Sequence, residues 1–227
     1  MPPAPKLEVP RFEIVSVTPF QQNCCILWDP ASRAGIIIDP GGDAPLILKR
    51  VAALGLRIEA ILLTHGHLDH AGGVEDVREG LASQGSTSPS QVPVIGPDRR
   101  DAFLLAAIAA QAQAMGIPGM RNASPDRYIE EGEVLELAGR RFEVLLVPGH
   151  TPGHVVFFDR AAGLLIGGDA LFAGSVGRTD FPYCDGPLLI RSIKDKLLPL
   201  GDEVVVMPGH GPSTRIGDER CRNPFLQ

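Results

Sequence analysis

Length, composition and charge limit the classes of protein to which this chain can belong. Its 227 residues suffice for one large domain with a buried core, and 44% hydrophobic and 21% charged residues are ordinary proportions for a globular protein. The formal net charge is −6 at pH 7. We therefore expect no nucleic-acid partner, because binding to phosphates requires clustered Lys and Arg.

The first half of the chain predicts strands that alternate with helices. Apolar residues recur with helical spacing over 43–54, where Gly55 is a plausible end, and a second helix begins at residue 69 or 70 and runs to about 79. Residues 80–91 are rich in Gly, Ser and Pro and predict a mobile surface loop, and an Ala-rich helix is expected over 99–115. Strands are predicted at residues 12–17, 23–28, 34–39, 58–64 and 92–96.

The second half of the chain is richer in predicted strands. A helix is expected at 187–198 and a short one at 216–221. No linker separates the halves, so we predict one domain over residues 1–227, an α/β fold with two sheets and outer helices. Strands are predicted at residues 133–139, 141–149, 154–160, 164–170 and 203–209.

The start of the chain and its cysteines predict a cytoplasmic protein. The N-terminal residues lack the apolar run of a secretory signal, and the most apolar stretch, residues 102–110, is too short to span a bilayer, so we expect no membrane partner. The four cysteines show no Cys-x-x-Cys spacing, and the adjacent Cys24 and Cys25 would point to opposite faces of a strand. We expect reduced thiols rather than a disulfide framework. The sequence does not indicate an oligomeric state.

Residues 62–73, LLTHGHLDHAGG, concentrate half of the six histidines of the chain together with Asp69. His65, His67 and His70 follow an apolar run and precede two glycines. A single buried histidine is more often a satisfied core residue than a ligand, but a cluster of this kind favours metal binding.

The remaining histidines occur in similar places. His150, His154 and His210 each follow an apolar strand in a turn rich in Gly and Pro, and so does Asp169. Loops at strand ends commonly gather the ligands of one site. Pro and Gly between the first two of these histidines exclude a helix there, so only His150 is expected to point to the same place as the first cluster.

Counted together, these side chains are enough for two adjacent divalent metal ions. Imidazole and carboxylate ligands without Cys favour zinc and tolerate iron or manganese. If two metal ions shared these side chains, coordination positions on the ions would stay open for water, as in hydrolytic two-metal sites. The candidate ligands are His65, His67, Asp69, His70, His150, Asp169 and His210.

The motif THGHLDH resembles the Thr-His-x-His-x-Asp-His signature of the metallo-β-lactamase superfamily. The stretches PGHTPGHVVFF, GSVGRTDFP and PGHGPSTRIGDERCRNPFL are similar to short bacterial glyoxalase II-like hydrolases, the hydroxyacylglutathione hydrolase group without a long C-terminal helical domain. The resemblance covers nearly the whole chain. It implies a four-layer αββα sandwich of two mixed β-sheets flanked by helices.

The resemblance also assigns the ligands. It implies that Asp169 bridges the two metals, and because the best-known lactamase subclass has Cys at this position, we expect no lactamase. The first metal is then bound by His65, His67 and His150, and the second by Asp69, His70 and His210.

The activity implied is hydrolysis of a thioester such as S-lactoylglutathione, a small-molecule glutathione conjugate. Asp69 would orient the attacking water and accept its proton, unless its only role is at a helix N-terminus. Arg178 aligns with a glutathione-binding lysine of full-length glyoxalase II, although a salt-bridged surface arginine is the alternative. Asp39, Thr64 and His154 would orient the metal-bound histidines. Asp39 could equally be only a turn former, since Asp-Pro-Gly is a common turn sequence.

Other activities stay open. Without the C-terminal helical domain, the preference for glutathione is in doubt, and a different thioester or another hydrolase reaction of the superfamily is possible. A mononuclear-iron persulfide dioxygenase and a non-enzymatic, metal-stabilised binding protein are the remaining hypotheses. The helix at 99–115 would either roof the pocket with Phe103 and Met115 or pack in the core.

Overall fold

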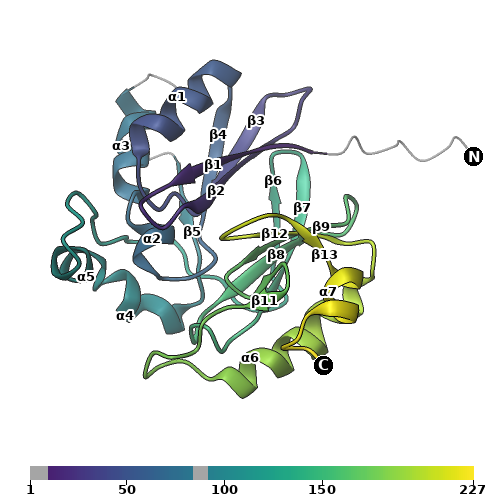
Figure 1. Cartoon of the computed structure of the whole chain (residues 1–227). Helices are drawn as coiled ribbons and strands as arrows, with labels where there is room; N and C mark the ends of the chain where they lie inside the picture. The colour runs from purple at the N-terminus through teal and green to yellow at the C-terminus, as the bar shows by residue number, and fades with distance from the viewer. Residues whose placement is uncertain (1–9, 84–91) are drawn as a thin grey trace, which may run out of the picture.

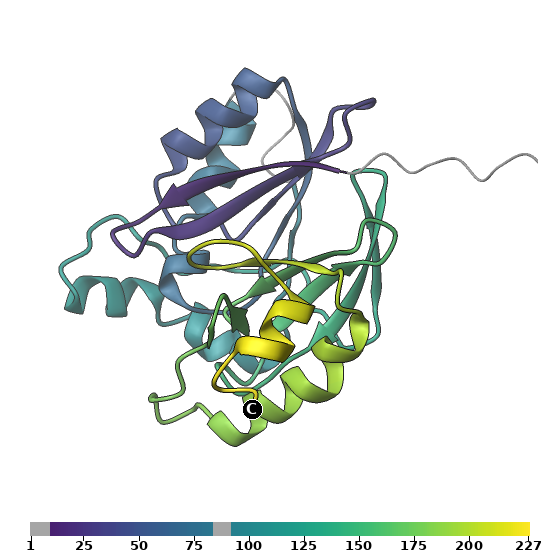
Figure 2. The same ribbon diagram turned by 45° about the vertical axis from the view of Figure 1, so that its right-hand side comes forward.

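The computed structural model describes residues 10–83 and 92–227, and in it two β-sheets lie face to face with helices on their outer sides (Figure 1). Turning the molecule by 45° shows the same layers, with α1 and α3 against one sheet and α6 and α7 against the other (Figure 2). The predicted α/β class and αββα sandwich are confirmed. In the described part of the chain, no helix has the length and apolarity needed to cross a membrane.

The first sheet contains five strands in the order β1-β2-β3-β4-β5. It is mixed, because β1, β2 and β3 pair antiparallel whereas β3, β4 and β5 pair parallel. All five residues of β3, AGIII, are buried, which explains their continuous apolar run. The strands are β1 (Arg11–Val17), β2 (Gln22–Trp28), β3 (Ala34–Ile38), β4 (Arg57–Leu62) and β5 (Val94–Ile95).

The second sheet contains six strands in the order β13-β12-β9-β8-β7-β6. Only β9 and β12 pair parallel in it, so this sheet is mixed as well. A separate pair, β10 and β11, follows β9. The strands are β6 (Val134–Leu137), β7 (Arg140–Leu146), β8 (Val155–Asp159), β9 (Leu164–Gly168), β10 (Leu171–Phe172), β11 (Ser175–Val176), β12 (Val205–Pro208) and β13 (Thr214–Arg215).

The helices cover the outer faces of the sheets. Helix α1 (Ala44–Leu54) ends at Gly55 as predicted, because this residue has a φ of 62° and its N–H bonds to the Ala52 carbonyl. A left-handed backbone of this kind favours glycine. The other helical segments are α2 (Leu68–Ala71), α3 (Val74–Ser83), η2 (Arg99–Asp101), α4 (Ala102–Leu105), α5 (Ile108–Ala114), α6 (Gly186–Ser192), η3 (Ile193–Leu197), η4 (Leu198–Leu200) and α7 (Ile216–Arg222).

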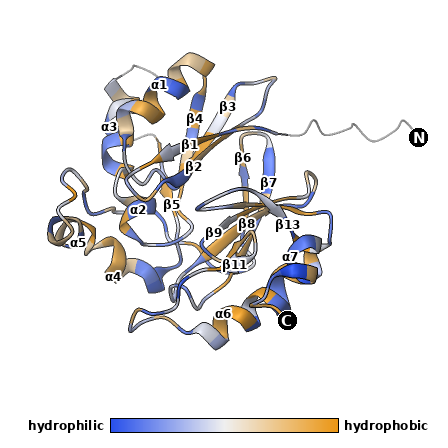
Figure 3. Cartoon of the chain, viewed as in Figure 1, coloured by the Kyte–Doolittle hydropathy of each residue, from blue (hydrophilic) through white to orange (hydrophobic). Residues whose placement is uncertain are grey.

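Three buried apolar clusters separate the four layers. Ile36 and Ile38 face the middle cluster, where they join Phe142 and Phe157 of the second sheet. Ile37 faces an outer cluster shared with residues of α1 and α3, because side chains alternate between the faces of a strand. The third cluster combines residues of β8 and β9 with α6 and η3. Figure 3 shows the hydrophobic residues concentrated along the strands, whereas α7 carries many hydrophilic ones.

Three helix boundaries differ from the prediction. The helix expected from residue 69 or 70 to 79 is two helices, α2 and α3, interrupted at Gly72 and Gly73, since glycine has a low helix propensity. Helix α3 then runs to Ser83, so the predicted loop is wrong at residues 80–83, and its residues 84–91 lie outside the described chain. The helix expected over 187–198 is α6 followed by a π-helical segment, η3.

The predicted helix over residues 99–115 is wrong as a continuous element. It consists of a 3₁₀ turn, η2, and the two short helices α4 and α5. The local sequence around residues 106–107 contains neither Gly nor Pro, so no helix-breaking residue marks the break. The short strands β10, β11 and β13 were not predicted. The single domain over residues 1–227 stays a prediction.

Candidate metal centre

The candidate ligands follow the ends of strands at one edge of the two sheets, in turns or, for Asp69 and His70, in the short helix α2. The histidine cluster follows β4, His150 follows β7, Asp169 follows β9 and His210 follows β12. Because β9 and β12 run parallel, their carboxyl ends meet at the same edge. The architecture thus brings residues from both halves of the chain into one site.

His65, His67 and His150 form the first group of possible ligands. Nε2 of His65 and Nε2 of His150 each lie 3.0 Å from Nδ1 of His67. Three nitrogens bound to one tetrahedral zinc ion at its usual bond length lie roughly 3.3 Å apart. The spacing therefore suits one metal ion.

Hydrogen bonds on the far sides of the rings determine which nitrogens face the centre. His65 Nδ1 donates to Thr64 Oγ1 at 3.0 Å, and Thr64 Oγ1 donates to Asp39. His150 Nδ1 donates to the Arg178 carbonyl at 2.8 Å. In the neutral rings Nε2 is then unprotonated, which is the form that binds metal. Lone pairs directed at one point repel each other unless a cation lies between them.

Asp69, His70 and His210 form a second group. Asp69 Oδ2 lies 3.2 Å from His210 Nε2 and 3.9 Å from His70 Nε2. His210 Nδ1 donates to the Phe20 carbonyl at 3.2 Å, so Nε2 faces the group and carries a lone pair in the neutral ring.

Asp169 lies between the two groups. Its Oδ2 is 3.6 Å from Nε2 of His150, in the first group, and 3.6 Å from Nε2 of His210, in the second. Its Oδ1 is 3.3 Å from His70 Nε2. One carboxylate is therefore within reach of ions in both places.

Two buried atoms lack partners at this centre. Among the described residues, His70 Nε2 and Asp169 Oδ1 have no hydrogen-bond partner of acceptable geometry. Buried polar atoms are normally paired, and a divalent cation bound by nitrogen and oxygen would satisfy both. The donor set therefore fits a metal.

Electrostatics within the centre also favour a cation. Burial lowers the pKa of His67 to about 3 and lowers the pKa values of His65 and His150, so these rings are neutral donors. At His70 burial acts in the same direction, but the charges of Asp169 and Asp69 outweigh it and raise the pKa well above its usual range. The negative charge of two carboxylates is thus concentrated beside His70, where a cation would be stabilised.

Asp39 supports the ligands rather than joining them. Its Oδ1 accepts the Thr64 N–H at 2.8 Å, and its Oδ2 accepts the Thr64 hydroxyl at 2.6 Å and His70 Nδ1 at 3.0 Å. Although the carboxylate lies close enough to His65 and His70 to be grouped with them, both of its oxygens are occupied by donors. One buried carboxylate therefore orients a histidine of each group.

His154 is buried beside the ligands but faces away from the centre. Its Nε2 accepts the backbone N–H of Asp169 at 2.9 Å, and its ring stacks on His65 with 5.0 Å between centroids. The structure thus places His150 with the first group and His154 behind it.

Tyr183 is a site residue that the sequence did not indicate. Its hydroxyl lies 2.9 Å from His67 Nε2, on the side of the ring opposite the metal-facing nitrogen. The neighbouring Cys184 donates from its thiol to the His150 carbonyl at 3.0 Å. The loop after Arg178 therefore holds two ligands of the first group, and only the tertiary structure reveals this.

Asp101 is the second residue that sequence reasoning missed. Its buried carboxylate accepts the Gly66 N–H at 2.9 Å, the Thr151 hydroxyl at 2.6 Å and the Gly153 N–H at 2.6 Å. Gly66 separates two histidine ligands, and the other two donors follow His150. Asp101 therefore ties together the two turns that carry the first group.

A cavity of about 610 Å³ opens directly onto both groups. Gln111 and Met115, in and just after α5, form part of its wall, whereas Phe103 contacts the cavity only through Tyr183, at 5.5 Å between ring centroids. Of the two predicted roof residues, the structure places Met115 at the cavity and Phe103 one side chain away.

Arg178 lies at the mouth of this cavity with its side chain 60% exposed. Two guanidinium nitrogens donate to the two oxygens of Asp180, each at 2.7 Å, and the guanidinium lies 4.4 Å from the centre of the Phe181 ring. Its role in substrate binding stays a prediction.

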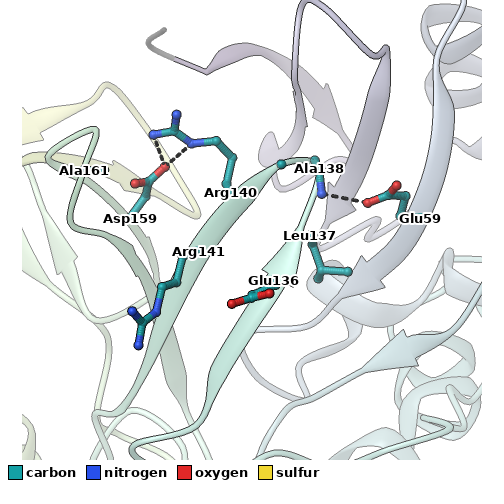
Figure 4. Close-up of a pocket in the computed structure, with 9 residues that line it drawn as sticks. Glu59, Glu136, Leu137, Ala138, Arg140, Arg141, Asp159 and Ala161 are labelled. Atoms are coloured by element: carbon teal, nitrogen blue, oxygen red, sulfur yellow. Dashed lines mark hydrogen bonds and ion pairs between the residues drawn. The ribbon is translucent and has the colours of Figure 1, made fainter. Parts of the chain in front are cut away.

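A second cavity, of about 390 Å³, lies at the β6–β7 hairpin and contains none of the candidate ligands (Figure 4). Two interactions lie at this cavity: Arg140 pairs with Asp159 at 2.6 Å, and Glu59 accepts the backbone N–H of Ala138 at 2.7 Å.

Comparison with known families gives a match over most of the chain. Residues 17–210 match the model described as the metallo-beta-lactamase superfamily. A protein of Haemophilus influenzae named hydroxyacylglutathione hydrolase GloC is 44% identical over 217 residues, which cover 95% of this chain and 98% of that protein.

Two solved structures with the same fold also match nearly the whole chain. The BLEG-1 B3 metallo-beta-lactamase has a TM-score of 0.84 at 34% identity and covers 95% of this chain and 99% of its own. TTHA1623, solved in a di-iron-bound form, has a TM-score of 0.81 at 38% identity, with 94% and 100% covered.

Proposed function

This chain belongs to the metallo-β-lactamase superfamily and is a metal-dependent hydrolase, and we propose that it uses two divalent metal ions to hydrolyse a small-molecule thioester such as S-lactoylglutathione. The observation that carries the proposal is the position of Asp169, whose Oδ2 lies 3.6 Å from a histidine of each ligand group. A carboxylate within reach of both groups could be shared by two adjacent ions, as hydrolytic two-metal sites require. The name of the relative from Haemophilus influenzae supports the thioester substrate.

The residues that would hold the metals are those of the two groups. The first ion would be bound by His65, His67 and His150, the second by Asp69, His70 and His210, with Asp169 shared. Nitrogen and carboxylate ligands without a Cys thiolate favour zinc and accept iron or manganese. The di-iron form of TTHA1623 supports the second possibility.

Asp69 is the catalytic carboxylate in this proposal. It lines the cavity, and attraction by His70 and His210 outweighs the effect of burial and lowers the pKa of its carboxyl, so it is ionised at neutral pH. Two bound cations would lower the pKa of a coordinated water and polarise the thioester carbonyl. Asp69 then orients the water and accepts its proton. The departing thiolate is stable and needs little assistance from an acid.

The proposal also includes the cellular compartment of the enzyme. The four cysteines are free, which supports a reducing compartment, and we place the protein in the cytoplasm as one domain acting on a small molecule.

The test is S-lactoylglutathione hydrolysis by purified protein whose metal content is counted on the same batch. We expect about two metals per chain and hydrolysis that is lost in Asp169→Ala. Asp195→Ala is the matched control, because Asp195 is exposed on η3, away from the cavity. One iron per chain without hydrolysis would overturn the thioesterase and favour the persulfide dioxygenase.

A further inference from the structure

The cavity at the metal centre has aromatic side chains on both flanks. Phe181 and Tyr183 stack on each other, 5.4 Å apart and 17° from parallel, and lie 5.8 and 6.1 Å from the His67 ring. On the other flank, Phe172 lies 6.3 Å from the His210 ring. A substrate that reaches both ligand groups therefore meets an aromatic surface on either side.

The mouth of the cavity is also apolar. Phe20 and Met115 line it while remaining 42% and 56% exposed, and Phe103, which packs edge-on against Tyr183, is 49% exposed. Large apolar side chains left exposed around a concave site are typical of surfaces that bind an apolar ligand.

Cationic recognition, in contrast, is weak in this cavity. Apart from the histidines, Arg178 is the only basic side chain among the described residues that line it. Asp180 occupies its guanidinium from one side and Phe181 covers it from another. The two carboxylates of a glutathione group would thus find one cation whose charge is already compensated.

We propose that this site selects thioesters by a large apolar acyl group, aromatic or aliphatic, and does not depend on the charges of the thiol. The inference rests on the proposed thioesterase function and names its substrate class. Apolar contact would supply the binding, since each methylene buried from water contributes favourably.

Two substrate pairs test the inference on metal-loaded enzyme. S-mandeloylglutathione differs from S-lactoylglutathione by a phenyl group in place of a methyl, and we expect kcat/KM to rise at least tenfold. S-mandeloyl-N-acetylcysteamine carries the same acyl group on an uncharged thiol, and we expect its kcat/KM to lie within about threefold of the glutathione ester.

A variant pair assigns the preference to the aromatic wall. Phe181→Ala should reduce the ratio of mandeloyl to lactoyl kcat/KM at least fivefold. Phe12→Ala should leave this ratio unchanged, because Phe12 is an exposed phenylalanine at the start of β1 that does not line the cavity.

A binding measurement separates this inference from the thioesterase proposal. Calorimetry would compare S-benzylglutathione with S-methylglutathione, thioethers that cannot be hydrolysed. At least tenfold tighter binding of the benzyl compound supports the apolar site even if no thioester is cleaved, an outcome that would overturn only the proposed reaction. Equal binding of the two thioethers would overturn the apolar site. A preference in kcat/KM for the glutathione ester over the N-acetylcysteamine ester that disappears in Arg178→Gln would overturn it as well.

Discussion

Replacing Asp39 by Asn should weaken the binding of both proposed metal ions at once. The carboxylate accepts hydrogen bonds from three donors, namely Thr64 N, Thr64 Oγ1 and His70 Nδ1. It therefore orients His70 directly and His65 through the Thr64 hydroxyl. An Asn side chain has the same shape but offers only one oxygen, so its NH₂ must face at least one of these donors.

The size of the effect follows from which donor loses its partner. With the NH₂ group in the place of Oδ1, the buried N–H of Thr64 is unpaired, which costs about 1–3 kcal/mol. In the other orientation the NH₂ group opposes the proton on His70 Nδ1 and pushes that ring out of its metal-binding form. Loss of such supporting groups typically lowers metal affinity by about 10–100-fold. We expect a change of this size for both metals, and a metal-free protein destabilised by about 1–3 kcal/mol.

Competition with a chelator measures the two metal affinities, and urea unfolding of the metal-free protein measures its stability. Asp43→Asn is the matched control: Asp43 is exposed and accepts one hydrogen bond, from Thr18 N at 2.7 Å, which an Asn oxygen can keep. Unchanged affinity for both metals in Asp39→Asn would refute the shared support. Weaker binding of one metal alone would refute the role of the Thr64 hydroxyl in linking Asp39 to His65.

Three further changes test other features of the site. Burial raises the pKa of Asp101 to about 6 from 3.8, so the protonated form is favoured in the folded protein, and its stabilisation is full below about pH 4 and lost as pH rises through about 6. Urea unfolding should show wild type losing about 2 kcal/mol relative to Asp101→Asn between pH 4 and 7, and a constant difference would contradict this. A methyl group in Gly209→Ala would overlap with Asp169 Oδ1 and His70 Cε1, so metal counting should find fewer than two ions per chain, and two tightly bound ions would contradict the geometry. Tyr183→Phe removes the hydroxyl beside His67 Nε2; chelator competition should show roughly tenfold weaker binding of one metal, and an unchanged affinity would leave this hydroxyl without a role.

The sequence alone determined most of the strands and the candidate ligands. Apolar runs such as AGIII became buried strands because a strand covered on both faces must be apolar throughout. The histidines and Asp169 could be identified because polar residues directly after buried strands collect at one sheet edge. The structure brings all seven candidate ligands together there.

Only the tertiary structure decided which residues support and surround those ligands. Nothing in the local sequence distinguishes Asp101 or Tyr183 from surface residues, because their partners lie on other turns of the chain. It also placed the Thr64 hydroxyl on the Asp39 carboxylate and paired Arg178 with Asp180. Hydrogen bonds between distant segments depend on how the two sheets pack, and sequence periodicity describes each segment only by itself.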